Sequence, residues 1–558
     1  MTRPETTVAG YLLHRLKEIG VGHLFGVPGD FVLGFLNRVL ESEVAYVGTC
    51  NELNSAYAAD GYARLKGVGA FASTFGVGEL SALNGVAGAF AERVPVVVIT
   101  GAPATTDFAA RPLLHHTLGD YDIPFRMFQE VTVAQTKLES GDTAPAEIDR
   151  VLTACLALQQ PVYLRLPSDV VSMACPWPQP FVFQTHGLSD PGALGEAVAE
   201  AAARLERAQR PLVIAGVDLN RFGFHKEFAA LLAKTGFPYV TMMLGKAVLS
   251  EWHPQFMGVY EGDRSREAVR HQVESADLVL QLGNWKTDFN TGGFTTRSDL
   301  NSEITADLRS VKIGHHIYED VWLPEFLGAL TQVLTRKEAA LPGMLNASQS
   351  CLHRRTKPFH AQPDVPLTVS RLFDRMSHFL EDRTVVLAET GVSLFSAAEM
   401  LLPDGAAFIG QTFYGSIGYT VGAALGACLA APGRQVVLFV GDGAFQVTGQ
   451  DLSTMIRYGA KPVIVLLNNE GYTIERLICD RPYNDLQPWR YSKLAEVFGG
   501  PPGWEVSTEG ELELALASAV AAPGLVFLEV HTGRWDSPEA LKSAGRSMAL
   551  ANHLEVAP

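Results

Sequence analysis

Short runs of consecutive apolar residues recur along the chain, separated by longer segments in which small and apolar residues repeat at helical spacing. The clearest runs are 96–99, 211–216, 278–283, 436–440 and 463–467. Strands that are apolar on both faces and alternate with amphipathic helices are typical of parallel sheets covered by helices. The pattern therefore predicts an α/β protein built from doubly wound parallel sheets.

Two proline-rich segments without helical periodicity interrupt this alternation, at 174–190 and 340–366. We interpret them as linkers between three domains, and the length of 558 residues agrees with three or four. The predicted domains span 1–180, 190–340 and 365–558.

The first and third blocks resemble each other. In each, a glycine-containing segment (74–78 and 412–418) opens a small-residue helix that leads into an apolar strand. From the pattern alone, shared composition explains this likeness as well as shared structure does. The apolar stretch 419–431 is too short and glycine-rich for a membrane span and is interpreted as a buried helix.

Composition narrows the function classes. The formal charge of −16 argues against a nucleic-acid partner. No run approaches the roughly 18 apolar residues that a membrane helix needs, and the N-terminal segment lacks the core of a signal peptide. The six cysteines are scattered, without a CxxC pair. We therefore expect reduced thiols and a cytoplasmic protein without a membrane partner.

The most specific chemistry follows the last two apolar runs. Gly441-Asp442-Gly443 ends one strand, and Asn468-Asn469 ends the next. Ligands of open α/β sheets bind at the carboxyl ends of strands, and carboxylate and amide oxygens suit Mg²⁺. Because glycines let the backbone approach an anion, the pattern predicts a metal-bridged diphosphate site.

Together with further motifs, this pattern resembles the thiamine diphosphate (ThDP) enzymes, and among them the 2-oxo acid decarboxylases similar to pyruvate and indolepyruvate decarboxylase. The motifs that carry the resemblance span nearly the whole chain: Phe25 to Asp30, Asn51 to Asn54, Tyr57 to Arg64, His115-His116, Gly441 to Gly443, Asn468-Asn469 and Gly471 to Glu475. The resemblance implies three domains that bind the pyrimidine ring, form the middle of the chain and bind the diphosphate.

The resemblance also implies where the cofactors bind. Mg²⁺ would be held by Asp442, Asn469 and the carbonyl of Gly471. ThDP would lie between two chains, so a homodimer is the smallest active unit, and homotetramers are common in the family. The implied cofactor-binding residues are Thr390, Gly415, Ile417, Gly441, Asp442, Gly443, Ala444, Asn469, Gly471, Tyr472 and Thr473. Relatives often have a serine where Ala444 stands, so one hydroxyl contact to the diphosphate is missing here.

The implied catalytic residues are Glu52 and a second polar set. Glu52 matches the glutamate that bonds the pyrimidine nitrogen and thereby activates the cofactor as an ylide. Ile417 matches the residue that bends the cofactor, and the carbonyl of Gly415 matches an acceptor for its amino group. Asp30, His115, His116 and Glu475 match the groups that act in decarboxylation and in protonating the enamine. The two histidines could also bind a metal, but the sequence offers no third ligand at suitable spacing.

The implied substrate pocket contains residues of different size: Phe289, Leu394, Ile474, Ala544 and Met548. Phe289 resembles pyruvate-preferring members, whereas Leu394 stands where strict pyruvate enzymes often have tryptophan. We expect the substrates to be pyruvate and short or branched aliphatic 2-oxo acids, which the enzyme would convert into an aldehyde and CO₂. The alternative is an aromatic decarboxylase for phenylpyruvate or indolepyruvate.

Two other classes stay open. An acetolactate-synthase-like carboligase shares the cofactor but generally lacks the histidine pair and Glu475. A non-catalytic ThDP-binding protein would have no reason to keep Glu52 or the histidines. Relatives activated by substrate often carry a cysteine in the middle domain, and residues 191–335 contain none.

Overall fold

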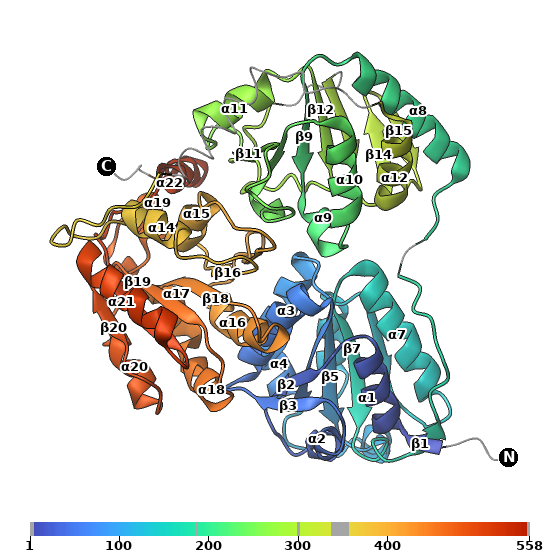
Figure 1. The fold of residues 1–558 in the computed structure, drawn as a ribbon. Helices are drawn as coiled ribbons and strands as arrows, with labels where there is room; N and C mark the ends of the chain where they lie inside the picture. The colour runs from blue at the N-terminus through green and yellow to red at the C-terminus, as the bar shows by residue number, and fades with distance from the viewer. Residues whose placement is uncertain (1–4, 186, 298–301, 336–356, 555–558) are drawn as a thin grey trace.

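A computed structural model describes residues 5–185, 187–297, 302–335 and 357–554. Three large parallel or mostly parallel sheets, each flanked by helices, follow one another along the chain (Figure 1). The N-terminal sheet (blue to teal) and the C-terminal sheet (yellow to red) lie side by side, and the middle sheet (green) lies across from both. The predicted α/β fold class is confirmed.

The N-terminal sheet has six parallel strands in the order β3-β2-β4-β5-β7-β6. Its strands are β2 (His23–Gly26), β3 (Ala45–Gly48), β4 (Gly69–Thr74), β5 (Val96–Ala102), β6 (Ala134–Lys137) and β7 (Val162–Pro167). Its helices are α1 (Val8–Glu18), α2 (Leu33–Leu40), α3 (Glu52–Lys66), α4 (Val77–Ala91), α5 (Thr105–Ala110), α6 (Ile123–Gln129) and α7 (Ala144–Leu158).

The C-terminal sheet repeats this topology, with the parallel order β17-β16-β18-β19-β21-β20. Its strands are β16 (Val385–Ala388), β17 (Ala407–Ile409), β18 (Val436–Gly441), β19 (Val463–Asn468), β20 (Trp504–Val506) and β21 (Val526–His531). Its helices are α14 (Val369–Ser377), α15 (Val392–Ala398), α16 (Tyr419–Ala430), α17 (Asp442–Thr448), α18 (Leu452–Arg457), α19 (Thr473–Ile478), α20 (Tyr491–Val497), α21 (Glu509–Ala521) and α22 (Glu539–Ala551). Numbered in chain order, both sheets arrange their six strands as 2-1-3-4-6-5, so the likeness of the two blocks is structural.

The middle sheet has seven strands in the order β11-β10-β9-β12-β13-β14-β15. The strands are β9 (Pro211–Ala215), β10 (Tyr239–Thr241), β11 (Phe256–Val259), β12 (Leu278–Leu282), β13 (Glu303–Ala306), β14 (Ser310–Ile313) and β15 (His316–Glu319). The helices are α8 (Pro191–Arg207), α9 (Val217–Arg221), α10 (His225–Thr235), α11 (Glu267–Glu274) and α12 (Leu323–Val333). The first five strands are parallel, and β14 and β15 extend the sheet as an antiparallel hairpin.

The predicted linkers differ in outcome. The first, predicted without helical periodicity, begins with the short strand β8 (Ala174–Pro176), which pairs with β1 (Glu5–Thr7). This pairing satisfies backbone groups at the entry to the linker. Much of the second, residues 340–356, lies outside the described residues. The domain limits 1–180, 190–340 and 365–558 stay a prediction.

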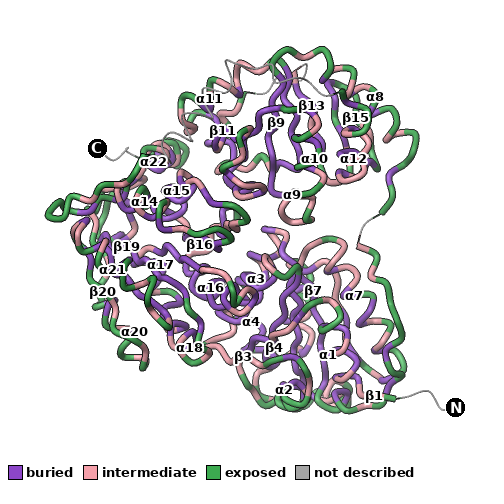
Figure 2. Tube along the Cα trace, viewed as in Figure 1, coloured by how far each residue is buried: buried purple, intermediate pink, exposed green. Residues whose placement is uncertain are grey.

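The N- and C-terminal sheets are joined through two equivalent helices, α3 and α16, which each precede the third strand of their sheet. The helices touch backbone to backbone. A Cβ added to Gly426 would lie 2.0 Å from the Ala58 carbonyl oxygen, and one on Gly61 would lie 2.3 Å from that of Ala423. Nearly all of α16 and the central part of α3, Asn54 to Ala63, are buried, and their apolar residues belong to one continuous core (Figure 2). Glycine at these positions is therefore required for the close approach.

We expect Gly426→Ala to destabilise the protein by about 1–3 kcal/mol, because the added methyl group forces the two helices apart. The midpoint of thermal unfolding at fixed protein concentration measures this. Gly328→Ala on α12 is the matched control, since nothing lies within 4 Å of the added Cβ. It should raise the midpoint slightly, because alanine is the better helix former. Equal midpoints for the two variants would contradict the close-packing argument.

Candidate active site

The connection between β4 and α4, residues 74–78 (loop 74–78), packs against several of the N-terminal candidate residues. A Cβ on Gly29, the neighbour of Asp30, would meet the Thr74 side chain at 2.5 Å. A Cβ on Gly76 would lie 2.1 Å from the His116 carbonyl oxygen, and one on Gly78 would lie 2.9 Å from Glu52 Oε1. The loop 74–78 thus brings Asp30, His116 and Glu52 around one end of the sheet, as the rule for open α/β sheets predicts.

Asp30, His115 and His116 form a compact polar cluster. His115 Nε2 and Asp30 Oδ2 are 2.7 Å apart, and one ligand atom from each of the three residues lies within 4.8 Å of the others. The sequence offered no third metal ligand beside the histidines, but the fold supplies one in Asp30, far away along the chain. The His115 ring stacks on Phe31 at 5.1 Å, and His116 has a left-handed backbone with φ of 66°. Stacking restrains the His115 ring, whereas the left-handed backbone of His116 carries a conformational cost.

Glu52 is the first residue of α3. Asn51 caps this helix, because its side chain accepts the Asn54 amide at 2.8 Å. The half-buried Glu52 carboxylate has no hydrogen-bond partner among the described residues. The positive end of the helix dipole favours its charge. The carboxylate is therefore positioned by the helix and free to bind a ligand.

The C-terminal candidates gather where β18 and β19 end. Asp442 is the first residue of α17, and it is buried. Its two carboxylate oxygens accept the amides of Gly443 at 2.8 Å and Gly471 at 3.0 Å. Burial raises the pKa of Asp442 to about 6, and these amides and Arg476 oppose that rise.

Two observations fit a metal and a diphosphate at this place. Asn469 Oδ1 is buried without a hydrogen-bond partner, so an oxygen ligand is available beside Asp442. Gly443 packs on the Tyr472 ring so closely that a Cβ would lie 2.4 Å from it. The residues therefore fit the Mg²⁺ ligand set that the resemblance implies. At Gly443 there is space for a backbone without a side chain only, as expected where a backbone amide contacts a diphosphate.

The remaining cofactor candidates differ in how far the protein itself occupies their polar groups. Thr390 Oγ1 is also buried without a partner. Gly415 has φ of 69° and nothing within 4 Å of an added Cβ, so its backbone is accessible, and Ile417 packs partly buried against the core. Thr473, in contrast, donates its hydroxyl to the Arg534 carbonyl at 3.1 Å and so holds the start of α19.

Four of the five pocket candidates meet in one hydrophobic cluster. Leu394 and Ala544 are buried in it, and Phe289 and Ile474 pack against it. The Phe289 and Phe395 rings are 5.8 Å apart. Met548 is half-buried on α22 and lies outside that cluster. Glu475 is exposed, and no hydrogen bond or ion pair among the described residues joins it to Asp30 or the histidines.

The sequence did not reveal three buried ionic groups beside the site. Arg476 is fully buried and donates to the Asn469 carbonyl at 3.0 Å and to Asp485 at 3.0 Å. Glu389, just before Thr390, accepts the hydroxyl and amide of Thr420. The adjacency of Arg476 to the Gly471–Glu475 motif is a signal that could have identified it.

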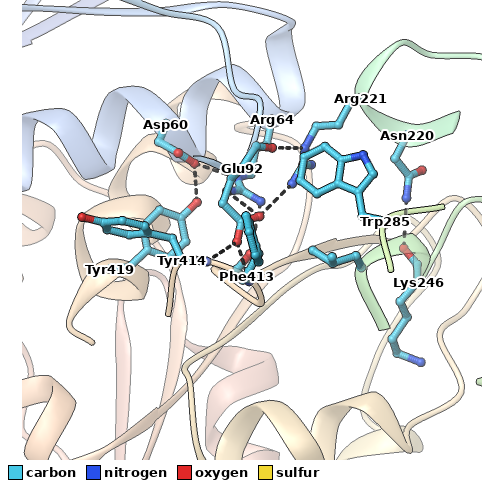
Figure 3. A network of polar contacts seen from close by, with 12 residues as sticks. Asp60, Arg64, Glu92, Asn220, Arg221, Lys246, Trp285, Phe413, Tyr414 and Tyr419 are labelled. Carbon is cyan, nitrogen blue, oxygen red and sulfur yellow. Dashed lines mark hydrogen bonds and ion pairs between the residues drawn. The ribbon is translucent and has the colours of Figure 1, made fainter. Parts of the chain in front are cut away.

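The third group, Glu92, holds the segment that leads to Gly415. Its carboxylate accepts the amides of Phe413 at 2.7 Å and Tyr414 at 3.2 Å, and faces Arg64 and Arg221 (Figure 3). These residues come from all three parts of the chain. The network therefore ties the segment that precedes Gly415 to α9, which flanks the middle sheet.

No helix among the described residues is long and apolar enough to span a membrane.

Comparison with known proteins identifies the family. Sequence models of thiamine pyrophosphate enzymes match three regions: the N-terminal TPP binding domain over 6–123, the central domain over 198–334 and the C-terminal TPP binding domain over 390–530. An alpha-keto-acid decarboxylase of Mycolicibacterium paratuberculosis is 41% identical over 97% of this chain and 96% of its own. One from Mycobacterium tuberculosis is 39% identical over 98% of both chains, and a pyruvate decarboxylase of Candida glabrata is 38% identical over 91% of both. The chain therefore belongs to the thiamine pyrophosphate enzyme family, as its motifs predict.

Proposed function

We propose that the protein is a ThDP- and Mg²⁺-dependent carboxy-lyase that converts a 2-oxo acid into an aldehyde and CO₂. The observation that carries the proposal is the convergence of Asp30, His115, His116 and Glu52 around loop 74–78. A decarboxylase needs proton donors next to the group that activates its cofactor. A carboligase has no need for this donor cluster, because its product carbon attacks a second carbonyl instead.

Each residue has a chemical task in this reaction. When bound, ThDP supplies the carbon that adds to the 2-oxo group and accepts the electron pair left by CO₂. Glu52 would hold a proton at the pyrimidine nitrogen through a charge-assisted hydrogen bond. Asp442, Asn469 and the Gly471 carbonyl would hold Mg²⁺ against the diphosphate. His115, paired with Asp30 at 2.7 Å, would move a proton at the product carbon, together with His116 and Glu475.

The complete site requires a second copy of the chain. The Asp30 cluster belongs to the N-terminal sheet and Glu475 to the C-terminal one, and no described contact joins them within one chain. Apolar side chains beside both half-sites are exposed in the single chain: Val77 by 56%, Leu113 by 90% and Phe413 by 45%. A partner chain would cover them. A homodimer is thus the smallest active unit, and a cytoplasmic homotetramer is our expectation.

For the substrate, we propose pyruvate and short or branched aliphatic 2-oxo acids. Phe289 is half-buried and packs against the cluster that contains Leu394 and Ala544, neither of which is a large ring, and it would narrow the pocket there. An aromatic 2-oxo acid is the alternative, and it would need Phe289 to move.

The decisive test incubates the protein with ThDP, Mg²⁺ and a panel of 2-oxo acids, and measures CO₂ and the organic product. We expect aldehyde and CO₂ in equal amounts. A hydroxyketone as the main product would favour the carboligase.

Glu52→Gln should lose at least about a hundredfold in kcat, because glutamine cannot act as a charged acceptor. Exchange of the cofactor C2 proton, followed by NMR after acid quench, should slow equally. Unchanged exchange would show that Glu52 has another role.

The metal assignment is tested through cofactor binding. Asn469→Ala should weaken Mg²⁺-dependent binding of ThDP at least about tenfold, because the orphaned oxygen is lost. Asn468→Ala is the matched control, since this neighbouring amide donates to Glu529 at 2.8 Å instead. Isothermal titration calorimetry with and without Mg²⁺ after EDTA treatment measures both. Equal losses in the two variants would contradict the assignment.

The pocket proposal predicts selectivity across a chain-length series. Each methylene added to the substrate should increase kcat/KM by an amount equivalent to up to roughly 1 kcal/mol of binding free energy, until the substrate reaches the pocket walls. Phe289→Ala should shift the optimum to longer or aromatic acids. Phe294→Ala on the same segment is the control, because Phe294 is 71% exposed. Unchanged selectivity in Phe289→Ala would show that this residue is not the wall.

A further inference from the structure

Loop 74–78 contains a strained turn. Gly76 has φ of 67° and ψ of −92°, close to the γ-turn with positive φ, which is rare and strained. Such a conformation persists only when its surroundings determine it. The Gly76 amide donates to Glu79 Oε1 at 2.7 Å, within the first turn of α4. Glu79 therefore holds the turn that packs on His116 and lies beside Glu52.

Glu79 is not an ordinary helix cap. It is fully buried, whereas capping carboxylates normally face water. Its second oxygen accepts the Tyr163 hydroxyl at 2.6 Å from β7. Burial raises the pKa of Glu79 to about 6, and the Tyr163 hydroxyl, the Gly76 amide, Arg165 and Thr100 oppose that rise. Both oxygens act as acceptors, which is the hydrogen-bonding pattern of the ionised form.

The same network reaches both ends of the segment that carries the two histidines. The buried Arg165 guanidinium donates to Asp122 at 2.6 Å, after the histidines, and lies 4.9 Å from the Phe108 ring, before them. The positive charge of Arg165 also acts on Glu79, because it lowers the pKa of that carboxyl group against the effect of burial. Loop 74–78 and the histidine segment thus rest on one buried support, which Glu79 and Arg165 share.

We propose that Glu79 is a positioning residue of this active site, which fixes the turn at Gly76 and through it the relative placement of Glu52 and His116. The proposal rests on the proposed function for its catalytic meaning. The Glu79 side chain bonds the Gly76 amide and the Tyr163 hydroxyl, and neither group is among the residues proposed to bind substrate or cofactor. Its effect is preorganisation: without it the loop relaxes, and the two half-site groups lose their fixed geometry.

The experiment compares Glu79→Ala with Glu79→Gln. Alanine removes the acceptor for the Gly76 amide, so hydrogen exchange of the peptide containing 74–78 should accelerate at least about tenfold, as expected when a buried hydrogen bond is lost. The value of kcat should fall by at least about tenfold, with a smaller change in KM. Glutamine keeps one carbonyl acceptor, and the Tyr163 hydroxyl can turn to accept from its amide. The Gln variant should therefore recover kcat to within about threefold of the wild type and restore most of the protection.

Asp149→Ala is the matched control. Asp149 is also a buried carboxylate that accepts a tyrosine hydroxyl, from Tyr11 at 2.7 Å, and pairs with an arginine, but on α7 away from the loop. It should lower the unfolding temperature while kcat and exchange at 74–78 stay within about twofold, since distant sites act independently. If Glu79→Ala does not fold, Tyr163→Phe and Glu79→Gln provide the comparison, and slower turnover with faster loop exchange in Tyr163→Phe supports the proposal.

Wild-type kcat and wild-type exchange in Glu79→Ala would overturn the proposal, as would equal activity losses in Glu79→Ala and Asp149→Ala. If the wild-type protein releases no CO₂ from any 2-oxo acid, the proposed function fails. Exchange at 74–78 then still decides whether Glu79 holds the turn, so the two failures are distinguishable.

Discussion

The rest of the structure depends on the backbone contact between α3 and α16. It joins two sheets of identical strand order, and it is possible only because Gly61, Gly422 and Gly426 present no side chain at the crossing. Each helix begins beside residues that we propose to act on the cofactor, with Glu52 at the start of α3 and the Gly415–Gly418 segment before α16. Close packing at the helix crossing therefore sets where the polar groups at the helix ends lie.

Charges buried at this junction are balanced within it. Asp60 accepts Arg64 at 2.6 Å and also the Tyr419 hydroxyl, while Glu92 faces Arg64 and Arg221. Two carboxylates and two guanidinium groups thus neutralise one another where water is excluded. A buried ion pair of this kind adds little net stability compared with apolar packing. The ion pairs instead fix the orientation of the helices that carry them, because the charged groups can pair with one another in only one arrangement.

Much of the fold could be predicted from apolar runs. The runs at 211–216, 278–283, 436–440 and 463–467 match β9, β12, β18 and β19 to within one residue. Strand β5 continues three residues past its apolar run, because Thr100 and Gly101 still pair with β7. The hairpin of β14 and β15 was not predicted, since its short strands alternate in polarity and carry no long apolar run.

The candidate site could be predicted where its chemistry is written in contiguous motifs, as for Asp442 and Asn469. It could not be predicted where it depends on contacts across the fold. The resemblance, and not the local pattern, joined Asp30 to His115, which lies 85 residues further on, and nothing in the sequence joined Glu79 to Tyr163, 84 residues further on. Local pattern contains no term for such pairs. Burial also turned residues with an ordinary surface appearance, such as Glu79 and Arg476, into parts of the site's support.

The buried carboxylates show what this support costs. Glu79 has its pKa raised from 4.5 to about 6, so the folded state binds its proton more tightly than the unfolded chain does. The stability that this proton contributes is present below pH ~4.5 and is lost as the pH rises through about 6, a difference of about 2 kcal/mol. The same sign holds for Asp442, where a bound divalent cation would offset the loss. At Glu79 the Tyr163 hydroxyl, the Gly76 amide, the Arg165 charge and Thr100 oppose the rise only in part. At neutral pH, an uncharged side chain at this position would be more stable than the ionised Glu79. The presence of the carboxylate is therefore explained by the strained turn that it holds rather than by stability.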